Sequence, residues 1–93
     1  MTIKIPKNLK RCTPVFIEWV DIIGDCTWED NDSDLDCPVL LAVGFYISHD
    51  DKQVVIAMNI AQKVDDEEVS GRQAIPLGAI NDFYRVRLKK VGK

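Results

Sequence analysis

The sequence predicts one all-β domain, and three observations lead to this fold class. Its 93 residues can build only one hydrophobic core. β-branched and aromatic residues gather in short runs, which are separated by polar stretches rich in Asp, Asn and Gly. No segment has apolar side chains at helical spacing for more than about two turns. Strands are therefore expected along the chain, joined by turns and polar loops.

Residues 1–12 are predicted to form an extended basic arm. Pro6 and Pro14 disfavour a helix there. The arm carries three apolar residues, Ile3, Ile5 and Leu9. These side chains allow it to lie as an extra strand along a sheet edge, in its own chain or across a dimer.

The first half of the domain predicts two strands and a loop. β-branched and aromatic side chains dominate residues 15–23, which we expect to be a strand. Residues 24–38 hold six acids, a composition typical of a long exposed loop. The central strand, residues 39–47, is nearly all apolar, and Gly44 in its middle indicates a bulge or bend.

A hairpin is the strongest tertiary prediction. Residues 53–60 should pair antiparallel with the central strand, because only about four polar residues, 48–51, separate the two apolar runs. A second polar stretch, 63–71, ends at Gly71, which suits a turn before a strand at 73–75.

The end of the domain predicts a short turn and a last strand. Residues 76–80 are too rich in Gly and Pro for an α-helix but suit a single 3₁₀ turn. Residues 81–88 then alternate as the last strand. Five strands with a 3₁₀ turn before the last favour a small SH3-like barrel over residues 13–90, with an OB-like barrel as the nearest competitor and 91–93 as a tail. The expected core is Ile17, Trp19, Val43, Phe45, Val55, Ile80 and Val86.

Charge is distributed unevenly along the chain. Residues 1–11 and 85–93 carry nine cations and no acid, whereas 12–84 hold all fifteen acids against three cations, a balance of −12. We expect the basic ends and the acidic body to meet within or between molecules, so a homo-oligomer is one possible assembly.

The longest apolar run and the cysteines indicate where in the cell the protein is expected. The run, residues 38–47, is shorter than the roughly 18 residues that cross a bilayer, and no signal-peptide hydrophobic region is present. Cys12, Cys26 and Cys37 are an odd number, which fits reduced thiols better than a disulfide framework. A cytoplasmic protein without a membrane partner is expected.

Motifs for catalysis, metals or cofactors are lacking. Residues 30–34 resemble the start of a calcium loop, but Leu35 stands where the turn needs Gly and Leu41 where a closing Glu is needed. There is no C-x-x-C pair, and the only histidine, His49, falls in the predicted hairpin turn, where an exposed side chain is expected. We predict no enzyme activity, no catalytic or metal site and no cofactor.

The acidic loop is the predicted partner-binding site. Trp28 either anchors this loop or is presented to a partner, since loops and tryptophans are common in recognition surfaces. The candidate residues are Trp28, Glu29, Asp30, Asp32, Asp34 and Asp36.

Several short motifs resemble a group of small phage and prophage proteins. They are Glu18-Trp19-Val20-Asp21 followed by Gly24 and Trp28, then Val43-Gly44-Phe45, residues 54–57 and residues 75–80. The likeness covers about residues 15–87. It implies a phage or prophage origin, hence the cytoplasm of a host cell, and an SH3-like barrel rather than a particular activity.

The favoured function is therefore a non-enzymatic phage accessory protein that binds a host or phage protein and so modulates a host factor. Single-stranded nucleic-acid binding through the basic ends is an alternative. The acidic body disfavours it unless those ends converge on one face. A structural virion or assembly component is the third possibility.

Overall fold

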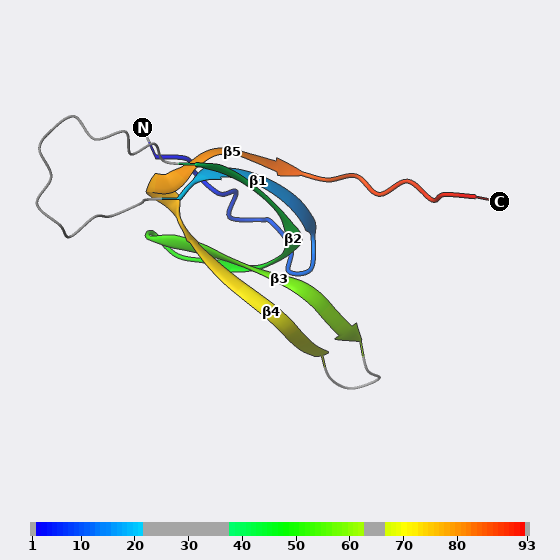
Figure 1. Ribbon diagram of the computed structural model, residues 1–93. Coiled ribbons are helices and arrows are strands. Elements are labelled where there is room, and N and C mark those ends of the chain that lie inside the picture. Colours follow the sequence, from blue (N-terminus) through cyan, green and yellow to red (C-terminus); the bar gives the residue numbers. More distant parts are fainter. Residues whose placement is uncertain (1, 22–37, 63–66, 93) are drawn as a thin grey trace, which may run out of the picture.

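Five strands and one short 3₁₀ helix form the fold (Figure 1), in a computed structural model that describes residues 2–21, 38–62 and 67–92. The elements are β1 (Pro14–Val20), β2 (Val39–His49), β3 (Gln53–Gln62), β4 (Glu67–Pro76), η1 (Leu77–Ala79) and β5 (Ile80–Arg85). The prediction of an all-β protein with a 3₁₀ turn before the last strand is confirmed. Of the described residues, none belongs to a helix long and apolar enough to cross a membrane.

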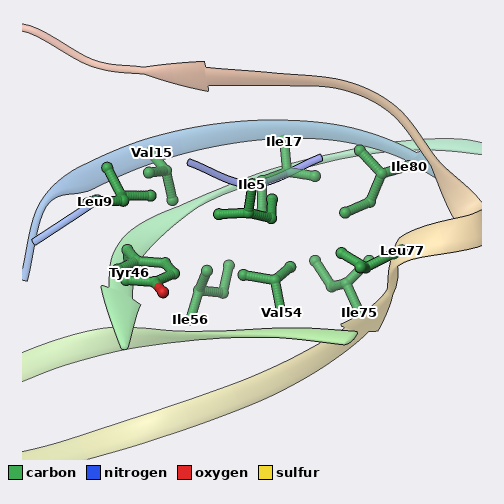
Figure 2. Close-up of a cluster of buried hydrophobic side chains, with 10 residues drawn as sticks. All are labelled: Ile5, Leu9, Val15, Ile17, Tyr46, Val54, Ile56, Ile75, Leu77 and Ile80. Atoms are coloured by element: carbon green, nitrogen blue, oxygen red, sulfur yellow. The ribbon is translucent and has the colours of Figure 1, made fainter. Parts of the chain in front are cut away.

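All five strands lie in one antiparallel sheet with the order β4-β3-β2-β1-β5. The sheet curls because β2 is shared: Val39–Phe45 pair with β1, and Phe45–His49 pair with β3. As a result β1 and β5 face β3 and β4 across the interior (Figure 2). The sheet is not closed into a barrel, since its edge strands β4 and β5 are not paired with each other.

The predicted β2–β3 hairpin is confirmed. Asp50 forms its turn: one carboxylate oxygen accepts the backbone N–H groups of Lys52 at 2.7 Å and Gln53 at 2.9 Å. The Asp50 N–H donates to the Gln53 carbonyl at 3.0 Å. These N–H groups stabilise the carboxylate and lower the pKa of Asp50.

Gly71 does not lie in a turn as predicted. It sits inside β4, between the cross-strand pairs Asn59–Ser70 and Ala57–Arg72. Its φ is +67°, and a Cβ there would lie 2.8 Å from the Cβ of Met58. Glycine is therefore needed for a close approach of two strands rather than for a reversal of the chain.

The core fills the space between the two halves of the curled sheet (Figure 2). Every strand contributes to it, and so do the arm and η1. The largest fully buried side chains are Ile17, Ile75, Val15 and Val54. The whole cluster is Ile5, Leu9, Val15, Ile17, Tyr46, Val54, Ile56, Ile75, Leu77 and Ile80.

The predicted core is right in β1 and at the start of β5 but wrong in β2 and β3. Ile17 and Ile80 are buried, and Trp19 is half-buried against the core. Val43, in contrast, is 67% exposed. Phe45, Val55 and Val86 are only half-buried.

In β2 and β3 the prediction chose the wrong face of each strand as the buried face. Tyr46 is buried rather than Phe45, and Val54 and Ile56 are buried rather than Val55. Both faces of these strands are apolar, so a period of two fits either choice, and a shift of one residue exchanges the faces. The irregularity in the β2–β3 register lies between Tyr46 and Ser48, not at Gly44.

The arm packs inside the sheet of its own chain rather than as a strand at the edge. Ile5 and Leu9 are buried between the two halves of the sheet (Figure 2), and residues 2–12 contain no strand. A turn closes between the Leu9 N–H and the Pro6 carbonyl at 3.2 Å. The Cys12 N–H then donates to the Tyr46 carbonyl at 2.7 Å, which anchors the end of the arm to β2.

Candidate interaction surface

The outer face of the sheet, turned away from the core, carries exposed apolar side chains on β2. Val39, Leu41 and Val43 alternate along the strand, and their exposed fractions are 57%, 64% and 67%. Successive alternate residues of a strand point to the same side, so the three form one row. Monomeric soluble proteins rarely expose such contiguous apolar surface without using it for binding.

This row continues across β1 to β5. Phe16 lies opposite Val43 on one side and opposite Tyr84 on the other. The rings of Phe16 and Tyr84 are 5.9 Å apart and inclined by 52°. Tyr84 is itself 53% exposed, so the ring pair extends the apolar row toward the β5 edge.

Two carboxylates lie beside the row. Glu18 is registered opposite Asp82 of β5 and opposite Leu41 of β2. Like charges directly opposite each other destabilise a sheet. A cation from a partner would relieve that repulsion, so the outer face combines apolar contacts with a place for Lys or Arg.

We define the outer face by its apolar residues and these two acids: Phe16, Glu18, Val39, Leu41, Val43, Asp82 and Tyr84. Sequence reasoning missed it, because Val43 was assigned to the core. The available signal was a strand apolar on both faces, since an antiparallel strand with one solvated face normally alternates with polar residues.

The predicted acidic site lies outside the described residues. Trp28, Glu29, Asp30, Asp32, Asp34 and Asp36 all fall within 22–37. The two points where this segment joins the sheet are described: Val20 pairs with Val39, and the Asp21 N–H donates to the Pro38 carbonyl at 3.1 Å. Both junctions are therefore adjacent to Val39, the first residue of the apolar row.

A cleft of about 410 Å³ lies between the arm and the β2–β3 turn. Ile3, Ile5 and Leu77 provide the apolar lining. The polar and charged lining residues are Thr2, Lys4, Lys7, His49, Asp50 and Asp51. Cations and carboxylates are mixed here, so the lining does not favour a ligand of one charge.

His49 is half-buried at the end of β2 rather than an exposed turn residue as expected. Its Nδ1 is 2.5 Å from the Tyr46 hydroxyl, and the two rings lie 5.8 Å apart. Burial raises the pKa of Tyr46 because it disfavours the phenolate. The pair therefore satisfies the buried hydroxyl of a core residue.

Glu67 ties the end of the arm to β4. One of its oxygens accepts from Arg11 Nε at 2.6 Å, and the other accepts from the half-buried Cys12 thiol at 3.2 Å. The Arg11 hydrogen bond, followed by that of Cys12, lowers the pKa of Glu67. Burial, reinforced by the hydrogen bond to Glu67, raises the pKa of the Cys12 thiol.

Acidification should release this link. A carboxyl whose folded pKa is lowered stabilises the fold above its ordinary pKa, here 4.5, and loses that contribution as pH falls through the folded pKa. We expect the melting temperature of Glu67→Gln to fall less than that of wild type between neutral pH and pH about 3. Asp51→Asn, which removes an exposed carboxylate from the β2–β3 turn, is the control. Identical acid curves for wild type and Glu67→Gln would contradict the role of Glu67.

Within the described ranges, no three His, Cys, Asp or Glu side chains gather closely enough to hold a metal ion. The calcium-like run at 30–34 lies outside those ranges. Comparison of the chain with protein-family models, with curated proteins and with solved structures found no match.

Proposed function

We propose that this chain is a non-enzymatic binding module that holds a protein partner on its outer face. The observation that carries the proposal is the row Val39, Leu41 and Val43, three aliphatic side chains that are each more than half exposed. Covering such a row removes apolar surface from water, which contributes roughly 25 cal/mol for each Å². The Phe16–Tyr84 pair adds the aromatic side chains that are enriched in the centres of interfaces.

The partner should present an apolar surface with a Lys or Arg side chain. Glu18 and Asp82 face each other next to Leu41, and a cation between them would lower their mutual repulsion. The balance of −12 over residues 12–84 also favours a basic partner and would speed its association at low salt.

In this proposal the acid-rich segment, residues 24–38, supplies a second contact with the partner. It joins the sheet at Val20 and Val39, next to the apolar row. A partner seated on the outer face therefore lies near the attachment points of the segment with Trp28 and the acids from 29 to 36, which the sequence predicts to be a loop. Loops attached to a rigid scaffold are where recognition residues concentrate.

The proposed architecture is an SH3-like barrel that is open between β4 and β5, in an accessory protein of phage or prophage origin. The strand order β4-β3-β2-β1-β5, the sharing of β2 between both halves and η1 before β5 support the barrel. The origin and the host-cell location are supported by the motifs at residues 15–87. Modulation of a host factor is the role that such a binding module would serve.

The test compares capture by wild type, Leu41→Ser and Met58→Ser. Leu41 is 64% exposed on the outer face, whereas Met58 is 69% exposed on β3 outside it, so the two changes remove similar exposed surface. We expect a protein held by wild type and Met58→Ser but lost with Leu41→Ser. Calorimetry with that purified partner should show weaker binding for Leu41→Ser, for Trp28→Ala and for Asp82→Lys.

Two outcomes would contradict the proposal. Equal affinity of the purified partner for Leu41→Ser and wild type would remove the outer face from the interface. Sedimentation that shows a wild-type dimer and a Leu41→Ser monomer would assign the face to a second copy of this chain instead.

A further inference from the structure

Arg85 lines two clefts on the side of the molecule where the arm meets β5. One cleft, of about 190 Å³, includes Lys4, Phe83 and Arg85. The other, of about 320 Å³, includes Asn8, Lys10 and Arg85. Leu9 contributes to both clefts as well, so they adjoin. The arm and the base of the C-terminal tail, which are at opposite ends of the sequence, thus share one surface.

This surface is basic. Lys4, Lys10 and Arg85 are exposed, and neither cleft is lined by an acid among the described residues. Beyond β5 the tail runs away from the body (Figure 1) and adds three further cations, Arg87, Lys89 and Lys90. We define the basic surface as Lys4, Lys10, Arg85, Arg87, Lys89 and Lys90.

Two other cations of the arm do not belong to it. Arg11 is bound to Glu67, and Lys7 lines only the cleft that also contains Asp50 and Asp51. Lys4 lines that cleft too, so it adjoins the smaller basic cleft at Ile3 and Lys4. Cations with carboxylates beside them should contribute less to phosphate binding, because a cation that is already paired with a carboxylate gains less from a phosphate.

Strand pairing and hydrogen bonds hold the backbone at two of the cleft cations, Arg85 and Lys10. Arg85 is registered opposite Val15, and the next residue, Val86, donates its N–H to the Pro14 carbonyl at 2.9 Å. The Lys10 carbonyl accepts the Thr13 hydroxyl at 2.7 Å and the Thr13 N–H at 3.2 Å. Placement on such a support reduces the conformational entropy lost when a ligand binds.

We infer that the basic surface binds the phosphate backbone of single-stranded nucleic acid, a function separate from the proposed protein contact. Each cation neutralises a phosphate and releases a condensed counterion. The acidic body opposes nucleic-acid binding only where it faces the strand, and the alternation of β5 places Arg85 on the opposite face of the sheet from Asp82. The half-buried ring of Phe83, in a cleft wall, provides a contact for a base or sugar.

A single strand fits this surface better than a duplex. The clefts are small and adjoin at Arg85, so a strand that places phosphates in both must pass from one into the other within a short distance. Single strands bend freely, whereas duplex DNA has a persistence length of about 50 nm and would touch mainly the protruding tail. The inference therefore predicts tighter binding of a single strand than of a duplex of the same length.

The test is fluorescence anisotropy of a labelled oligothymidylate over about 50 to 200 mM salt. Each phosphate contact in a single strand contributes about 0.7 to the slope of log K against log salt. Lys10→Gln with Arg85→Gln should reduce that slope by about 1.4 and weaken binding about 25-fold near 0.1 M salt. Lys52→Gln with Arg72→Gln removes the same net charge elsewhere and should leave the slope unchanged.

Several outcomes would overturn the inference. They are an absence of binding by wild type at low salt, equal slopes for the two double variants, and duplex binding as tight as single-strand binding. Leu41→Ser separates this inference from the proposed function, since it should abolish the protein contact and leave the oligothymidylate affinity unchanged. Loss of both activities in Leu41→Ser would place the nucleic acid on the outer face instead.

Discussion

Deletion of residues 1–11 is expected to lower the free energy of unfolding by about 3–6 kcal/mol. The deletion removes Ile5 and Leu9, which are 7% and 8% exposed and lie between the two halves of the sheet. Burying an aliphatic side chain of this size contributes about 1.5–3 kcal/mol. Because small domains are stable by only about 5–15 kcal/mol, the truncated chain should be close to unfolding at ambient temperature. Chemical denaturation and thermal melts measure the effect.

The opposite end of the chain provides the matched control. Deletion of residues 88–93 also removes a basic segment, but Leu88 and Val91 are 79% and 93% exposed. That truncation should leave the melting temperature nearly unchanged. Light scattering should show the same oligomeric state for both truncated proteins as for the full chain, because the arm packs in its own chain. Full stability after deletion of 1–11 would mean that the arm is a free tail.

Ile56→Ala is expected to cost about 2–5 kcal/mol, whereas Val43→Ala should change stability by less than about 0.5 kcal/mol. Ile56 is 3% exposed and faces the core cluster, so the truncation leaves a cavity as well as losing burial. Val43, 67% exposed on the outer face, leaves no cavity. Urea denaturation of the two variants provides the comparison. The reverse ranking would show that the sheet buries its other face.

The two variants also separate stability from recognition. Val43→Ala removes part of the apolar row without disturbing the core, so a loss of partner binding with an unchanged midpoint of unfolding would be a surface effect. Ile56→Ala should weaken binding only in proportion to the unfolded fraction.

Strand positions were largely predictable because they depend on local chemistry. β-branched and aromatic runs located β1 to β3, and the four polar residues at 48–51 are enough to predict the β2–β3 hairpin. The polar residues 67–70 misled the prediction for β4. They belong to a long hairpin with β3, in which backbone pairing outweighs the weak strand preference of Glu and Ser.

The facing of β2 and β3 could not be predicted, since residues 39–47 are apolar on both sides. A strand of this kind has two chemically acceptable orientations, and the choice is made by long-range packing against Ile17, Ile75 and the arm. The candidate outer face follows from that choice, so it could not be identified from the sequence for the same reason. The basic surface was hidden because residues 10 and 85 meet only after folding.

The sequence by itself determined the all-β class, the order of elements and the division into basic ends and an acidic middle, because these follow from local preferences and composition. Only the tertiary structure decided which face of β2 is buried, that Ile5 and Leu9 complete the core, and that Arg85 joins the arm at one surface. These depend on contacts between residues far apart in the chain. Their energies come from the shared burial of apolar side chains, which is non-directional and leaves no local signature in the sequence.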